Sequence, residues 1–90
     1  MTKDHDLWLI SDEVYDTQIW EGTHLSPRAL PNMAERTLVV GSMSKSHAMT
    51  GWRVGYAHGP SRLVEEMIKL QQFTFVCAPS MAQHGALAAL

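Results

Sequence analysis

The sequence has little cysteine and no long apolar run. A single cysteine, Cys77, stands among the 90 residues, so an internal disulfide framework of the kind found in small secreted domains is excluded. One free thiol fits a reducing compartment, and we therefore expect a cytoplasmic protein. No run approaches the roughly 20 apolar residues that span a bilayer. The early run LWLI follows DHD rather than the basic stretch of a signal peptide.

Charge and metal-ligand patterns are also scarce. Charged residues make up 18% of the chain and the net charge is −2, so no basic field favours binding to nucleic acid or to an anionic membrane. The five histidines include no pair four residues apart and have no cysteine partner at ligand spacing. We therefore expect no metal site.

The sequence does contain short apolar runs typical of strands, and segments with helical patterns. Buried strands are predicted at Leu7–Ser11 and Arg36–Ser42, and a third strand, with an alternating pattern, is predicted at Trp52–Gly59. Between the first two, Thr17–Asn32 holds two prolines and a glycine and is predicted as a loop, with one helical turn near Pro27–Leu30. Helices are predicted over 59–74, which carries an apolar stripe, and over 78–90. This alternation favours an α/β layer architecture.

The motif SDEVY follows the first predicted strand. Asp12 then lies at the carboxyl end of that strand, which is where α/β sheets bind ligands. A carboxylate there can hold a cationic ring nitrogen, and the phenol of Tyr15 can reach the same ligand. The alternative is that Asp12 and Glu13 cap a turn or are solvated, and Glu13 is expected to be solvated or paired rather than catalytic.

The motif SMSK follows the second predicted strand in the same way. Lys45 becomes a nucleophile where its surroundings favour the neutral amine. The hydroxyls of Ser42 and Ser44 suit an oxyanion, and the planar guanidinium of Arg53 matches a phosphate. Taken singly, each residue has an ordinary alternative: a surface lysine in a serine-rich loop, or an arginine reaching off a strand.

Together, SDEVY, SMSK and GWRVGY agree in residue type, order and separation with one family. They resemble the cofactor site of the pyridoxal-phosphate-dependent aminotransferases of class I/II, fold type I, and the stretch APSMAQ before the last helix fits as well. The resemblance implies a fragment of a three-layer α/β/α large domain with a mostly parallel sheet. Residues 1–90 would form part of the pyridoxal-phosphate-binding large domain, with the rest of it and a smaller domain outside this sequence.

The resemblance also implies a role for each motif residue. Lys45 would form a Schiff base with the aldehyde of pyridoxal 5'-phosphate and act as the catalytic acid and base. Asp12 would pair with the pyridinium nitrogen, and Tyr15 would hydrogen-bond the phenolic oxygen of the ring. Ser42 and Arg53 would bind the phosphate. A carboxylate at the ring nitrogen keeps the ring electron-poor, as this cofactor chemistry requires.

The implied activity is transfer of the amino group of an L-amino acid to a 2-oxo acid. The family's active sites lie at a dimer interface, so a homodimer is implied as the full-length enzyme. Two alternatives stay open within the resemblance: a fold-type-I lyase, or a fragment that is inactive by itself.

A remote alternative lies outside the resemblance. Ser42 to Lys45 also fits the Ser-x-x-Lys signature of acyl-serine hydrolases, with Ser42 as nucleophile and Lys45 as base. Those enzymes also need S-D-N and K-T-G elements, which are missing here. They place the motif at the start of a helix, whereas here it is expected directly after a strand.

Overall fold

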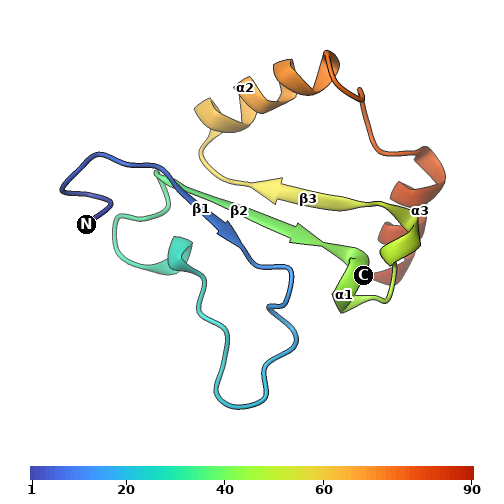
Figure 1. Cartoon of the computed structure of the whole chain (residues 1–90), viewed down its shortest axis with the longest axis horizontal. Helices are drawn as coiled ribbons and strands as arrows, with labels where there is room; N and C mark the ends of the chain where they lie inside the picture. The colour runs from blue at the N-terminus through green and yellow to red at the C-terminus, as the bar shows by residue number, and fades with distance from the viewer.

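The computed structural model describes every residue from Met1 to Leu90. Three strands form one sheet, and short or medium helices follow them along the chain (Figure 1). The strands are β1 (Leu9–Asp12), β2 (Thr37–Ser42) and β3 (Gly55–His58); the α-helices are α1 (Met43–Ser46), α2 (Ser61–Gln72) and α3 (Ser80–Ala89); the 3₁₀ turns are η1 (Pro27–Ala29) and η2 (Thr50–Trp52). None of the helices has the length and apolarity needed to cross a membrane.

All three predicted strands and both predicted helices exist, and the helical turn at η1 is confirmed. The largest error is in the third strand, which was predicted from Trp52 but begins at Gly55. Trp52 ends η2, and Arg53 adopts a left-handed backbone conformation (φ 54°, ψ 47°) that cannot continue a strand. The apolar pattern of WRVGY concealed this break because Trp52 and Val54 have the residue types of a strand.

The sheet has the order β1-β2-β3 and is mixed. Strands β1 and β2 are parallel, with Leu9 opposite Thr37, whereas β2 and β3 are antiparallel, with Ser42 opposite Gly55. The connection from β2 to β3 stays at the edge where β2 ends, because α1 and η2 pack together there and return the chain (Figure 1). A parallel neighbour would need a crossover to the opposite edge. The mostly parallel sheet that the resemblance implied therefore has one antiparallel pair within residues 1–90.

Burial is concentrated on the central strand and at its carboxyl end. Thr37, Leu38 and Val39 of β2 are buried. A second group joins α1, the segment before β3 and α3, and consists of Met43, Met49, Val54 and Ala82. This second cluster packs α1, and with it the end of the SMSK motif, against α3 and the segment before β3.

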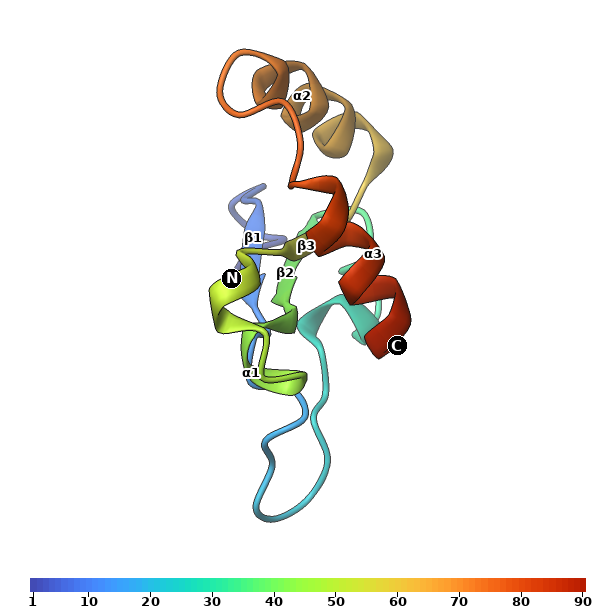
Figure 2. The same cartoon turned by 90° about the vertical axis from the view of Figure 1, so that its right-hand side faces the viewer.

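Much apolar surface remains uncovered. The chain is flat, with extents of 43 × 40 × 16 Å, and Figure 2 shows it nearly edge-on. Helix α2 buries none of its residues, so residues 1–90 leave its apolar stripe uncovered. Ile68 and Phe73 of that stripe are 52% and 87% exposed. Expressed alone, residues 1–90 are therefore expected to be poorly soluble.

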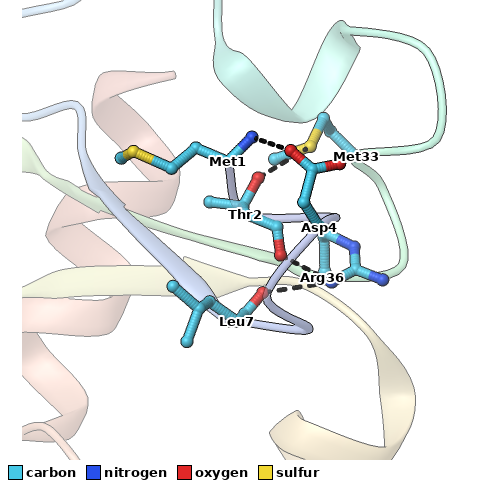
Figure 3. Close-up of polar contacts among 6 residues, drawn as sticks. All are labelled: Met1, Thr2, Asp4, Leu7, Met33 and Arg36. Atoms are coloured by element: carbon cyan, nitrogen blue, oxygen red, sulfur yellow. Dashed lines mark hydrogen bonds and ion pairs between the residues drawn. The ribbon is translucent and has the colours of Figure 1, made fainter.

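The amino-terminal turn is held to the start of β2 by Arg36. Its Nη1 donates to the carbonyl oxygens of Thr2 at 3.3 Å and Leu7 at 3.2 Å (Figure 3). The amino group of Met1 lies 2.6 Å from Asp4 in the same turn. These contacts gather at the edge of the sheet opposite to α1, so they take no part in the site described below.

The pairing of β2 with β3 depends on close approach at Gly55. A Cβ atom at Gly55 would lie 2.8 Å from the carbonyl oxygen of Gly41, which is backbone fixed in the neighbouring strand. We expect Gly55→Ala to lower the free energy of unfolding of the full-length protein by about 1–3 kcal/mol through overpacking. Gly51→Ala is the matched control, since nothing lies within 4 Å of its Cβ position, and a change within about 0.5 kcal/mol is expected. Equal urea midpoints for the two variants would contradict this close packing.

Candidate active site

Four of the predicted site residues come to one edge of the sheet. Asp12 ends β1 and Ser42 ends β2, and these two strands are parallel, so both ends point to the same edge. Lys45 follows in α1, which Figure 1 shows at the tip of β2. Because β3 is antiparallel to β2, its start lies at this edge too, and Arg53 comes just before it. Tyr15 lies in the turn directly after β1.

Asp12 has both the capping role and a free oxygen. Its Oδ1 accepts a hydrogen bond of 3.2 Å from the backbone N–H of Val14, which is the strand-end cap considered as an alternative. Its Oδ2 has no hydrogen-bond partner, and the residue is exposed. Tyr15 is 58% exposed, and its phenol is likewise unpaired. Both groups are therefore accessible to a ligand at this edge.

Lys45 lies on a one-turn helix rather than a loop. Ser42 is the N-cap of α1, and its hydroxyl accepts a hydrogen bond of 3.1 Å from the N–H of Ser44. Lys45 is exposed, and its amine makes no hydrogen bond or ion pair within the chain. This exposed, unpaired amine is available for covalent chemistry.

The helix also corrects one argument used against the acyl-serine alternative. The motif was expected directly after a strand and not at a helix start, yet α1 begins immediately after Ser42. The serine N-cap explains why the strand changes into a helix without a loop. The S-D-N and K-T-G elements that acyl-serine hydrolases also need are still missing from the chain.

A hydrogen-bond network joins the two serines to Arg53 through Thr50. The Ser42 and Ser44 hydroxyls are 3.0 Å apart, so one anion can contact both. Thr50 donates its hydroxyl to the Ser44 carbonyl oxygen at 3.0 Å, and its own carbonyl oxygen accepts from Arg53 Nη1 at 2.7 Å. Arg53 has no carboxylate partner, so its remaining N–H donors are free. Thr50 was not predicted, although a threonine hydroxyl commonly bonds to a nearby backbone carbonyl.

Glu13 is paired, which is one of the two states expected for it, and it forms a cluster with two residues that the sequence did not indicate. Its side chain is 9% exposed and accepts from the Ser26 hydroxyl at 2.6 Å and from His24 Nε2 at 2.8 Å. Burial raises the pKa of Glu13, but the hydrogen bonds from Ser26 and His24 outweigh it and hold the pKa below its usual value. Gln18 was also missed, and its side-chain amide donates to the Lys45 carbonyl oxygen at 3.4 Å.

The donor set at this edge fits pyridoxal phosphate. The cofactor presents a ring nitrogen, an aldehyde, a phenolic oxygen and a phosphate. The edge offers an unpaired carboxylate oxygen, a free amine, an unpaired phenol, and a phosphate-binding set of two hydroxyls and a guanidinium. Each group on the cofactor has a partner of the right chemistry among the residues present.

Comparison with known proteins agrees with the motifs. The family model "Aminotransferase class I and II" matches residues 1–90. The chain is 49% identical over 86 residues to the arginine–pyruvate transaminase of Pseudomonas aeruginosa, covering 96% of this chain and 22% of that protein. It is 42% identical over 96 residues to a probable aspartate aminotransferase of Methanocaldococcus jannaschii, covering 100% of this chain and 25% of that protein. The chain thus spans a quarter or less of the length of these relatives.

Solved structures give the same result for the fold. A mutant aspartate aminotransferase of Thermus thermophilus superposes with a TM-score of 0.92 at 38% identity, over 98% of this chain and 22% of the other. An aromatic aminotransferase of Pyrococcus horikoshii superposes with a TM-score of 0.91 at 41% identity, over 97% and 24%. The expected α/β fold, as part of the aminotransferase fold, is confirmed. On sequence and structure alike, the chain belongs to the class I and II aminotransferases.

Proposed function

We propose that the full-length protein carrying this chain is a pyridoxal-phosphate-dependent aminotransferase, with Lys45 as its catalytic residue. The observation that carries the proposal is the unpaired amine of Lys45 at the edge where Asp12 and Arg53 also lie. Family membership supports the same activity.

Each site residue of the chain is proposed to bind a different part of the cofactor. Asp12, with its free Oδ2, would pair with the ring nitrogen and favour its protonated form. Tyr15 would hydrogen-bond the ring oxygen. Ser42 and Arg53 would hold the phosphate, with Arg53 fixed in direction by its bond to the Thr50 carbonyl oxygen.

Lys45 is proposed to attach the cofactor covalently and to transfer the substrate proton. When bound, pyridoxal phosphate supplies an electron-poor ring that takes up the electron pair left at the substrate α-carbon. The Lys45 amine would hold the cofactor through its aldehyde and would give way to the substrate amine. As general base and then general acid, the freed Lys45 amine would move a proton from the substrate α-carbon to the carbon of the cofactor aldehyde.

The substrates are proposed only as classes. Relatives named for arginine with pyruvate and for aspartate support an amino acid and a 2-oxo acid. A homodimer is proposed for the full-length protein by resemblance to the family. The cytoplasmic location stays a prediction.

One spectroscopic experiment tests the activity. The full-length protein is loaded with pyridoxal phosphate, and the absorbance of the bound cofactor is followed on adding single amino acids. An aminotransferase changes this absorbance with each reactive amino acid, and a 2-oxo acid restores it. A fold-type-I lyase would turn over without needing the 2-oxo acid. Labelling of Ser42 by a fluorescent acyl reagent, with no absorbance change, would favour the acyl-serine alternative.

Arg53→Lys should weaken cofactor binding more than turnover. Lysine keeps the charge but cannot make two parallel hydrogen bonds to one phosphate. We expect the affinity for pyridoxal phosphate to fall by about 1–3 kcal/mol, the usual value of a charged hydrogen bond, with a smaller loss of turnover at saturating cofactor. Equilibrium titration measures the affinity. The control is Arg62→Lys, since Arg62 stacks on Trp8 away from this edge; equal affinities for the two variants would remove Arg53 from the phosphate site.

A further inference from the structure

The loop between β1 and η1 is closed at its base by one carboxylate. Glu13 directly follows β1, and its N–H donates to the Val40 carbonyl oxygen at 2.8 Å, which fixes it to β2. Its two carboxylate oxygens then bind the far end of the loop, Oε1 through Ser26 and Oε2 through His24. Residues 14–25, between Glu13 and Ser26, therefore form a closed loop that is attached to the sheet at Glu13. We call Glu13, His24 and Ser26 the base cluster.

The same loop reaches the reactive segment. Gln18 donates its side-chain amide to the carbonyl oxygen of Lys45 at 3.4 Å. Helix α1 has only one turn, so its last carbonyl groups have few partners inside the helix. The loop is also shaped from within, because Gln18 N–H donates to the Tyr15 carbonyl oxygen at 2.9 Å. Tyr15 and Gln18 therefore share one loop, and that loop contacts the backbone of Lys45.

Glu13 itself is not placed to meet a ligand. Its side chain is 9% exposed, and each oxygen already accepts a short hydrogen bond. A carboxylate in this state is poorly available as a base or as a cofactor ligand. Its neighbour Asp12 is the opposite case, exposed and with a free oxygen. Of the two adjacent acids, Asp12 is therefore accessible to a ligand, whereas Glu13 is held within the chain.

We propose that Glu13 is a positioning residue, which closes the loop of residues 14–25 and so sets Tyr15 in place and holds Gln18 against the backbone of Lys45. This inference rests on the proposed aminotransferase function. The base cluster fixes the loop, the loop fixes Tyr15, and Gln18 links the loop to α1. A displacement of about 1 Å at a reacting centre can cost on the order of 100-fold in rate, so a distant carboxylate can affect turnover strongly.

The test compares Glu13→Ala with Glu13→Gln in the cofactor-loaded full-length protein. Glutamine keeps an oxygen for the Ser26 hydroxyl and presents an N–H to His24, which can accept in its other tautomer. We expect Glu13→Ala to lower kcat roughly 10- to 100-fold per loaded site, with the KM for the amino acid changed less than about 3-fold. Glu13→Gln should recover most of that loss. Glu21→Ala is the matched control, because Glu21 is exposed in the same loop and makes no hydrogen bond.

Two further measurements separate positioning from simple stability. His24→Ala removes one hydrogen bond of the base cluster, and the His24 side chain is one-third exposed, so this variant can be used if Glu13→Ala does not fold. It should also lower kcat. Amide hydrogen exchange of residues 14–25 should be faster in Glu13→Ala and His24→Ala than in Glu21→Ala. A lower melting temperature with unchanged kcat per loaded site would overturn the proposal, as would equal loss in the alanine and glutamine variants.

Failure of the proposed function is distinguishable from failure of this inference. If the unmodified protein shows no absorbance change with any amino acid, the aminotransferase assignment fails. Amide hydrogen exchange of residues 14–25 does not depend on activity, so it still tests the base cluster in that case. Exchange rates that stay unchanged in Glu13→Ala and His24→Ala would overturn the role of the cluster in ordering the loop.

Discussion

Lys45→Ala is expected to lower turnover of the full-length protein on the order of 1,000-fold or more. The variant loses the covalent partner of the cofactor and the group that moves the substrate proton, and general acid–base catalysis alone commonly contributes 10²–10⁴-fold. The structure makes this lysine a reasonable choice because its amine is exposed and unpaired on α1. Pyridoxal phosphate should still bind to the variant without a covalent link, since Asp12, Ser42 and Arg53 remain. Turnover is measured with a saturating amino acid and 2-oxo acid.

Borohydride trapping followed by peptide mapping identifies the lysine directly. Reduction of the loaded protein should leave the cofactor on Lys45. Lys69 and Lys3 are the internal controls, because Lys69 lies on α2 and Lys3 in the amino-terminal turn before β1, away from the carboxyl ends of β1 and β2. The Lys69 amine is engaged at 2.6 Å by Glu66 on the exposed face of α2. An adduct found mainly on Lys69 or Lys3, or near-normal turnover of Lys45→Ala, would contradict the assignment.

The sequence predicted where the site residues lie better than it predicted the local structure that carries them. Asp12, Ser42 and Lys45 were assigned to strand ends because apolar runs precede them, and the structure has all of them at one edge. Arg53 reaches that edge for a different reason than expected. It was assigned to a strand, but it lies in a left-handed bend before β3, and the antiparallel pairing of β3 returns the chain to the edge.

The missed residues share a physical cause. Gln18 contacts Lys45 across 27 positions, and Glu13 contacts His24 and Ser26 across 11 and 13. A local pattern shows periodicity and turn chemistry, but it cannot show which distant polar groups a loop brings together. Helix α2 gives the converse case: its apolar stripe was recognised correctly, yet periodicity does not say which surface covers it, and residues 1–90 leave it exposed.

Asp12→Asn should separate the two roles of this residue. Asparagine is nearly isosteric and keeps an oxygen to accept the N–H of Val14, so the strand-end cap is retained. What the variant loses is the negative charge that supports a protonated ring nitrogen. We therefore expect the cofactor to stay bound and the melting temperature to change little. Turnover should fall by roughly two to three orders of magnitude, the usual size of such an electrostatic contribution.

The control for Asp12→Asn is Asp16→Asn, which makes the same change of charge four residues along the chain. The Asp16 side chain makes no hydrogen bond or ion pair, and it lies in the turn beyond the strand end. If general loss of negative charge near the site were responsible, both variants would slow alike. If charge at the ring nitrogen is responsible, only Asp12→Asn slows, and its deficit appears in the proton-transfer half-reaction rather than in cofactor affinity. Near-normal turnover of Asp12→Asn would leave this carboxylate with the cap alone, because the bond to Val14 is the one contact that both side chains can make.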